Sequence, residues 1–310
     1  MRVFVTGGTG LIGRALARSL IDCGYEVLAL SRRSAPEGLP PGVCSVAGDP
    51  AVPGPWLEAL ASCDACVNLA GEPVARGRWT PERKRAIRES RVASTRNVAA
   101  LLAVRGPSVL VNGSAAGIYG ERGDEELDES SPPGEGFLAE VALAWEGATG
   151  PAAARARVVL LRTGIVLARD GGALPKLAQP FRLFAGGPVG AGAFWQSWIH
   201  IEDEVGLILL ALRDGRLSGP LVATAPNPVR NRDLARALGR VLRRPSFLPT
   251  PPFAVRVAIG EMADVVLESE RALPRAALAR GYAFRFPDLE PALADLLRGT
   301  PQAARSTLGA

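Results

Sequence analysis

The stretch that most constrains this chain is residues 2–13, RVFVTGGTGLIG. Residues 2–6 are rich in β-branched side chains and predict a buried strand, and the apolar spacing around and after Gly13 predicts a helix. Gly7, Gly10 and Gly13 mark the passage from the strand to the helix. A strand, a glycine turn and a helix in this order are typical of a dinucleotide-binding turn. The spacing is GxxGxxG rather than GxGxxG, so a tight turn without a ligand is the alternative interpretation.

Each glycine of the turn has its own physical task. Gly7 lets the chain turn sharply, Gly10 leaves room for a pyrophosphate against the backbone, and Gly13 lets helix and strand pack closely. The helix N-terminus adds free N–H groups and a partial positive charge. The expected contacts with the cofactor phosphates are Gly7, Thr9, Gly10, Leu11, Ile12 and Gly13.

The end of the next predicted strand, residues 26–30, bears on the choice of cofactor. Ser31, Arg32 and Arg33 follow it. In a domain of this kind an acidic residue here binds the 2′-hydroxyl of NAD, whereas arginine accommodates the 2′-phosphate of NADP. We therefore expect NADP, with NAD less favoured, and contacts from Ser31 and Arg32. A solvated basic loop is the alternative.

Later strand ends supply the remaining expected cofactor contacts. Asp49 follows a third predicted strand, residues 43–47, where it could meet the adenine or only form a turn. Small residues follow a fourth strand, residues 65–69. A long helix begins after a threonine N-cap at Thr80, and its Arg91 could reach back to the cofactor or lie on the surface. The full set is Asp49, Leu69, Ala70, Gly71, Glu72, Arg91, Ser114 and Val166.

Predicted strands and helices alternate over the first half of the chain. This alternation predicts an α/β fold of the Rossmann type, a doubly wound parallel sheet with helices on both faces. Within it, the acidic and proline-rich residues 124–133 are expected to form a mobile surface loop. Beyond residue 170, glycines alternate with aromatic residues as far as Trp198, which suggests a wall over a ligand pocket or simple loop packing.

Composition narrows the class of protein. The chain has 310 residues, 47% hydrophobic and 22% charged, which is ordinary for a globular protein. No apolar run reaches the ~18 residues of a membrane span, and Met1 leads straight into a strand, so we expect no membrane segment, no signal peptide and a cytoplasmic location. The arginines are scattered, which argues against a nucleic-acid partner.

Metal and redox sites are also disfavoured. His200 is the single histidine of the sequence, which excludes a multi-histidine site. Cys63 and Cys66 are spaced as CxxC, but no second pair accompanies them, so buried thiols are expected rather than zinc or redox chemistry. We expect no metal.

Further motifs follow in order along the chain. They are VTGGTGLIG (5–13), VNLAGEP (67–73), RWTPERKRAIRESRV (78–92), SAAGIYG (114–120), FLAEV (137–141), LRTGIVL (161–167), SWIHIEDEVG (197–206), TAPNPVRNRDLARALG (224–239) and GEMAD (260–264). Together they resemble the extended short-chain dehydrogenase/reductase superfamily. Within it, they look like the atypical NAD-dependent epimerase/dehydratase-like subgroup, sometimes labelled cell-division-inhibitor-like. The resemblance covers essentially residues 1–297.

The resemblance implies a Rossmann cofactor half and a smaller C-terminal substrate lobe. On this basis residues 1–163 plus 198–225 form the NAD(P)-binding domain, residues 164–197 plus 226–298 form the lobe, and residues 299–310 are a tail. It also implies hydride transfer at a carbon of a sugar or other small molecule, with Ser or Thr, Tyr and Lys as the catalytic residues.

One part of the family pattern is missing. Ser114 matches the family serine, but the Tyr-x-x-x-Lys pair should open the helix after the acidic run, where this chain has Phe137 and Val141. Neither side chain can exchange a proton. One interpretation is an oxidoreductase acting on an unknown small carbonyl or sugar-type substrate, in which Tyr119 first, or His200 second, does the proton work. A structural role is the alternative for each of these two residues. The other interpretation is a non-catalytic NADP-binding sensor or scaffold. The oligomeric state is left open.

Overall fold

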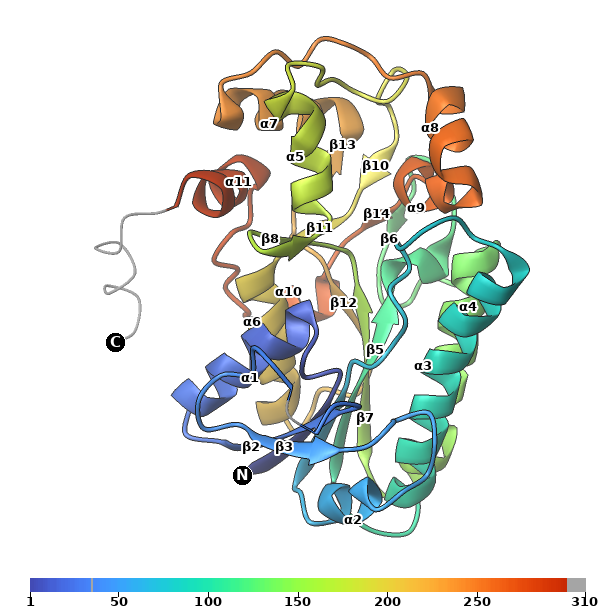
Figure 1. Cartoon of the computed structure of the whole chain (residues 1–310), viewed down its shortest axis with the longest axis vertical. Coiled ribbons are helices and arrows are strands. Elements are labelled where there is room, and N and C mark those ends of the chain that lie inside the picture. The colour runs from blue at the N-terminus through green and yellow to red at the C-terminus, as the bar shows by residue number, and fades with distance from the viewer. Residues whose placement is uncertain (35, 300–310) are drawn as a thin grey trace.

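The computed structural model describes residues 1–34 and 36–299 (Figure 1). Of the tail expected at residues 299–310, only Gly299 is among them, and the rest of that prediction lies outside the described residues.

The core of the fold is a parallel sheet of seven strands (Figure 1). They are β1 (Arg2–Thr6), β2 (Glu26–Ser31), β3 (Cys44–Ala47), β4 (Ala65–Asn68), β5 (Val109–Ala115), β7 (Arg157–Thr163) and β12 (Gly219–Ala223). Their order is β12-β7-β5-β4-β1-β2-β3, and every neighbouring pair is parallel. The chain builds one half of the sheet outward from β1 and then the other, so the predicted doubly wound α/β fold is confirmed.

Helices cover both faces of this sheet (Figure 1). They are α1 (Leu11–Asp22), α2 (Trp56–Ala61), α3 (Pro81–Leu102), α4 (Phe137–Gly147) and α6 (Ile201–Arg213), with 3-10 turns η1 (Ala116–Tyr119) and η2 (Gly150–Ala154). Val3 and Val5 of β1 pack with α1 and α6, whereas Phe4 points to the other face and stacks on Trp56 of α2 with ring centroids 6.1 Å apart. Because both faces are buried, β1 is apolar on both sides.

A second, smaller core lies in the C-terminal half and joins α5, α7 and α11. The elements of this half are β8 (Ile165–Ala168), β9 (Gly171–Gly172), α5 (Leu174–Arg182), β10 (Trp195–Gln196), β11 (Trp198–His200), β13 (Val229–Arg230), α7 (Asn231–Leu242), α8 (Pro252–Ile259), η3 (Gly260–Ala263), α9 (Asp264–Leu267), β14 (Arg271–Ala272), α10 (Arg275–Ala279) and α11 (Leu289–Arg298). The chain leaves the large sheet after β7 and returns to it at β12. The division into two lobes at residues 163, 197 and 225 stays a prediction.

The acidic run at residues 124–133 makes more contacts than the sequence indicates. It contains β6 (Glu126–Leu127), which pairs with β14. Asp124 accepts a hydrogen bond from Trp195 Nε1 at 2.8 Å and forms an ion pair with Arg230 at 3.0 Å. Most of the run lies at the surface, as predicted, but the sequence did not reveal its contacts, because Arg230 and Arg271, which pair with Asp124 and Glu126, lie far away in the chain.

No helix within residues 1–34 and 36–299 combines the length and the apolar character that a membrane crossing requires. In the same part of the chain, no group of three or more His, Cys, Asp and Glu side chains is arranged to hold a metal ion.

Candidate functional site

The glycine turn between β1 and α1 is shaped by backbone contacts. Gly7 has a φ of +68°, and a Cβ there would lie 2.8 Å from the carbonyl carbon of Leu69. A Cβ on Gly13 would lie 2.2 Å from the carbonyl oxygen of Gly7. These two glycines are needed for the turn itself, whether or not a ligand is present.

Gly10 differs from its two neighbours in the turn. It is the N-cap of α1 with an ordinary φ of −74°, and no side chain caps the helix. A Cβ on Gly10 would meet only the carbonyl oxygen of Gly7, at 3.1 Å. The first N–H groups of α1, at Leu11, Ile12 and Gly13, have no partner within the helix, and its first turn has no acidic residue. This arrangement fits a phosphate group.

A cavity of about 360 Å³ lies beyond the end of β2. Ser31 is buried there, and its Oγ accepts the backbone N–H of Arg33 at 3.1 Å. Arg14, which sequence reasoning missed, comes in from α1, and its Nη1 donates to the carbonyl oxygen of Thr9 at 2.7 Å. The sequence signal that could have identified Arg14 is its position one helical turn after Gly10. The cavity is lined by Thr9, Arg14, Ser31, Arg32, Arg33, Pro36 and Glu37.

That cavity has three guanidinium groups against one carboxylate. Guanidinium groups bind phosphate through charge-assisted and often bidentate hydrogen bonds. Asp49, by contrast, is exposed and does not line the cavity. Its Oδ1 accepts the N–H of Ala51 at 2.9 Å, so the structure gives it the turn role that was one of its two interpretations.

The segment after β4 is held by Arg91. Its Nη1 donates to the carbonyl oxygens of Glu72 and Ile87, both at 2.9 Å, and its guanidinium lies 5.1 Å from the ring centroid of Trp145. Burial lowers the pKa of Arg91 to about 10. A Cβ on Gly71 would come within 3.0 Å of its Cζ. Arg91 is therefore a support beneath the residues expected to contact the cofactor, rather than a free surface arginine.

Two further expected contacts sit close to these elements. The Glu72 carboxylate pairs with Arg83 at 2.7 Å, and this hydrogen bond lowers the pKa of Glu72. Val166 lies on β8, and its carbonyl oxygen and the Leu11 side chain both approach Gly172 of β9. The β8–β9 hairpin thus lies against the start of α1.

Ser114 and Tyr119 belong to one buried network. Ser114 Oγ donates to Glu146 at 2.6 Å, and Glu146 is paired through both oxygens with Arg162 at 2.9 and 3.0 Å. Tyr119 is fully buried; its hydroxyl donates to the Asp128 carbonyl oxygen at 2.7 Å and accepts from Arg162 at 3.0 Å. Burial raises the pKa of Tyr119 to about 12. This placement favours the structural interpretation of Tyr119 and turns the Ser114 hydroxyl into the interior.

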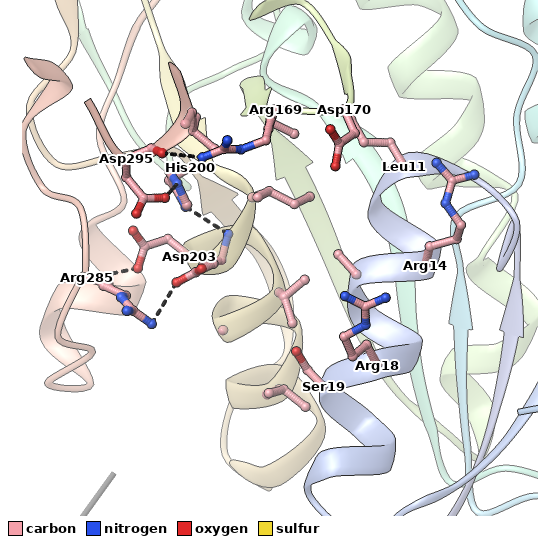
Figure 2. Close-up of a pocket in the computed structure, with 18 of the residues that line it drawn as sticks. Leu11, Arg14, Arg18, Ser19, Arg169, Asp170, His200, Asp203, Arg285 and Asp295 are labelled. Carbon is pink, nitrogen blue, oxygen red and sulfur yellow. Dashed lines mark hydrogen bonds and ion pairs between the residues drawn. The ribbon is translucent and has the colours of Figure 1, made fainter. Parts of the chain in front are cut away.

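His200 lies at a different cavity, of about 750 Å³, between α1, α6 and residues 282–296 (Figure 2). Its Nδ1 accepts the N–H of Glu202 at 3.1 Å and so caps α6. Its Nε2 lies 3.4 Å from Asp295, and its ring stacks on Phe286 at 3.9 Å. Nearby, Asp203 accepts the backbone N–H groups of Arg285 and Phe286 at 2.8 and 2.9 Å. These bonds tie α6 to the C-terminal segment and favour the structural interpretation of His200.

Within the glycine- and aromatic-rich segment, Phe184 is exposed, whereas the two tryptophans are packed. Trp195 lies between the guanidinium groups of Arg230 and Arg271, at 4.6 and 4.7 Å from its ring. Trp198 is buried in the second core, and its Nε1 donates to the Asn227 carbonyl oxygen at 3.1 Å. The loop-packing interpretation therefore accounts for these two tryptophans.

The CxxC thiols are buried and unbonded to each other. Both cysteines are free. Burial raises the pKa of Cys63 to about 11 and raises the pKa of Cys66 still further. Thiols of this kind are poor nucleophiles and poor metal ligands.

Sequence reasoning missed two carboxylates near the start of α4, those of Glu268 and Glu270. A Cβ on Gly117 would lie 3.6 Å from Glu270 Oε1, and one on Gly136 would lie 3.9 Å from Glu268 Oε1. Burial raises the pKa of Glu270 to about 8 and that of Glu268 to about 7. No local pattern could have revealed this, because the carboxylates and the helix are more than a hundred residues apart in the chain.

A Rossmann sheet, an uncapped glycine-rich helix start and a basic cavity beyond β2 define a dinucleotide-binding α/β protein. Comparison with known protein families identifies the chain more narrowly. It belongs to the NAD dependent epimerase/dehydratase family, whose model matches residues 3–221. A second profile, a domain of unknown function called DUF1731, matches residues 250–296.

Relatives match the chain almost from end to end. An epimerase family protein of Arabidopsis thaliana, named as a chloroplastic SDR39U1 homologue, is 41% identical over 96% of this chain and 87% of its own length. An epimerase family protein of Mycobacterium leprae is 39% identical over 94% of each chain.

Solved structures give the same fold. Human SDR39U1, solved with NADPH, has a TM-score of 0.86 at 34% identity and covers 97% of this chain and 100% of its own. MoeE5, solved with UDP-glucuronic acid and NAD, has a TM-score of 0.80 at 21% identity over 99% of this chain and 100% of its own. At that identity the likeness concerns the fold alone.

Proposed function

We propose that this chain binds NADP and uses it for hydride transfer to or from a small carbonyl or sugar-type substrate. The observation that carries the proposal is the cavity beyond β2, which Arg14, Arg32 and Arg33 line together with the buried Ser31. The solved relatives contain NADPH in one case and NAD in another. The preference for NADP therefore rests on this chain's own arginines.

The residues present fit the cofactor in two places. The uncapped N-terminus of α1 at Gly10 would hold the pyrophosphate, because its free N–H groups and partial positive charge suit an anion. The arginine cavity would hold the 2′-phosphate, with Ser31 as a hydrogen-bond partner. When bound, the cofactor would give a hydride as NADPH or take one as NADP⁺; this chain would supply binding, orientation and the group that exchanges the proton.

Calorimetric titration with NADPH and NADH tests the cofactor preference. Charge-assisted hydrogen bonds are worth ~1.5–3 kcal/mol each. Arg32→Ala and Arg14→Ala should therefore each weaken NADPH binding by about tenfold or more and leave NADH binding nearly unchanged. Arg18→Ala is the matched control, because Arg18 lies on α1 but lines the other cavity. Equal wild-type affinity for the two cofactors would remove the preference.

A non-catalytic NADP-binding sensor or scaffold is the second candidate. It is favoured by the first turns of α4, which read FLAEV without Tyr or Lys, and by the engagement of Ser114 and Tyr119 in a buried network. A panel of aldehydes, ketones and nucleotide sugars, followed by nicotinamide absorbance, separates the two functions. Tight NADPH binding without turnover on the whole panel would favour the sensor.

We propose a cytoplasmic protein with a small-molecule substrate and no nucleic-acid partner. The support is the scattered arginine and the cysteines, all four of which are free. The name of the Arabidopsis relative places that protein in the chloroplast, so fluorescence microscopy of the tagged chain is the direct test.

A further inference from the structure

The start of α4 lacks the expected acid and base but is flanked by two carboxylates. The structure brings Glu270 of the segment before β14 to Gly117, directly after β5, and Glu268 to Gly136, the N-cap of α4. Figure 1 shows β14 and α9 beside this end of the large sheet. Because Gly117 has no side chain, the Glu270 carboxylate and Leu138 of α4 both approach its backbone closely, at 3.6 and 3.3 Å from the place of a Cβ.

We propose that Glu270, with Glu268 beside it, is the group that exchanges a proton with the substrate oxygen. This inference rests on the proposed function and names the catalytic residue of that reaction. In the direction of reduction, the hydride passes from the nicotinamide C4 of NADPH to the carbonyl carbon. The proton of the Glu270 carboxyl group passes to the carbonyl oxygen. The products are an alcohol, NADP⁺ and the Glu270 carboxylate, which regains its proton from water.

The first support for this role is that the competing groups are engaged elsewhere. The hydroxyls of Ser114 and Tyr119 are both bonded inside the protein. Within the described residues, by contrast, no hydrogen bond or ion pair holds the carboxyl group of Glu270 or of Glu268. A proton donor must be within reach of its acceptor. A carboxyl group that no hydrogen bond or ion pair holds can turn toward a bound substrate.

The second support is that the Glu270 backbone is fixed. Its N–H donates to the carbonyl oxygen of Trp195 at 3.2 Å, and its carbonyl oxygen accepts from Ser197 Oγ at 2.7 Å. A catalytic side chain needs such support to stay in position. The neighbouring Arg271 is occupied by an ion pair with Glu126 at 3.0 Å and by the Trp195 ring.

The third support is the protonation state at neutral pH. Burial is the main cause that raises the pKa of Glu270 to about 8, and the charges of Glu268 and Glu121 add to it. Glu268 is in turn acted on by Asp264, Glu121 and Arg256, of which Asp264 and Arg256 form an ion pair at 2.9 Å. A carboxyl group that titrates near the working pH can serve as an acid in one direction and a base in the other.

The activity test compares Glu270→Gln and Glu268→Gln with Glu140→Gln, an exposed carboxylate on α4. On any panel member that wild type reduces, Glu270→Gln should lower kcat by ~10²–10⁴-fold and remove the loss of activity at high pH, with NADPH affinity unchanged. Glu268→Gln should move that loss to lower pH, because a negative neighbour is gone. Glu140→Gln should behave as wild type.

A second measurement does not depend on the substrate. Carbon NMR of protein labelled at the Glu carboxyl carbons should reveal a group that titrates above pH 7 and is absent in Glu270→Gln. Full turnover in Glu270→Gln, or titration of Glu270 near an ordinary glutamate pKa, would overturn this assignment while leaving the reductase proposal intact. Wild type that binds NADPH but reduces nothing would overturn both.

Discussion

The glycines of the first turn look equivalent in the sequence but are not equivalent in the structure. Gly13 is required by the fold, because any Cβ would overlap the Gly7 carbonyl oxygen at 2.2 Å. Gly10 has an ordinary backbone conformation and almost no protein around the place of a Cβ. A substitution at Gly10 therefore tests ligand binding, whereas a substitution at Gly13 tests folding.

Replacing Gly10 with Val should separate binding from stability. The new side chain would occupy the space proposed for the pyrophosphate, so NADPH binding by calorimetry should be lost. The urea midpoint should stay close to wild type, since the single close neighbour is one oxygen at 3.1 Å. Gly13→Ala should instead fail to fold or unfold at much lower urea. Retained NADPH affinity in Gly10→Val would place the pyrophosphate elsewhere.

Tyr119 should matter for stability and little for chemistry. Tyr119→Phe removes one bond to the Asp128 carbonyl oxygen and leaves Arg162 with one acceptor fewer. The free energy of unfolding should fall by ~1–3 kcal/mol, the usual cost of leaving buried groups unsatisfied. Turnover should change less than about threefold when measured well below the melting temperature. A loss of ~10² or more in kcat at unchanged stability would restore the catalytic interpretation of this tyrosine.

Strand ends carry a second buried network, which joins β1, β4, β5 and α3. Thr6 Oγ1 donates to Asn68 Oδ1 at 2.5 Å, and Asn68 Nδ2 donates to Thr95 and Asn112 at 2.9 and 2.7 Å. Trp145 of α4 adds a bond to Thr95 at 2.9 Å. The network fixes the carboxyl ends of the strands, which is where a Rossmann fold binds its ligand.

Asn68→Ala should destabilise the protein by ~2–4 kcal/mol, because several buried polar atoms would lose partners at once. Asn97→Ala on α3 is the control: its one bond, to the Pro50 carbonyl oxygen at 2.9 Å, lies at the half-buried rim. That variant should lose only ~0.5–1.5 kcal/mol. Urea denaturation of the two variants provides the comparison, and equal losses would contradict a cooperative network.

Prediction from the sequence succeeded where the residues that indicate an element lie within that element. The strand at residues 2–6 and the cap at Thr80 were readable because the signal for each lies within one segment. The small sheets were not readable, because β6 and β14 are two residues each and pair across the chain. For the same reason Glu270 entered the site only through the structure, whereas Arg14 had a local signal, its place one helical turn after Gly10.

Taken as a whole, the chain carries carboxyl groups whose pKa values are raised by burial. Glu204 is fully buried on α6, its Oε1 accepts from Thr163 at 2.8 Å, and burial raises its pKa from 4.5 to about 8. Glu268, Glu270 and Asp203 have raised pKa values for the same reason. Paired surface carboxylates such as Glu72 and Asp128 have lowered pKa values, so their contribution is lost only when the pH falls through those lowered values.

Stability should therefore decline as the pH rises from about 5 to about 8. In that window an unfolded glutamate has lost its proton while Glu204 keeps it, so the native state binds more protons and the free energy of unfolding falls with pH. Each such group contributes up to ~1.4 kcal/mol per pH unit. Glu204→Gln keeps an acceptor for Thr163 and cannot ionise, so its advantage over wild type should grow from pH 5 to pH 8 in urea denaturation. The exposed Glu140→Gln should run parallel to wild type. If Glu204→Gln also runs parallel, Glu204 is already ionised in the folded protein.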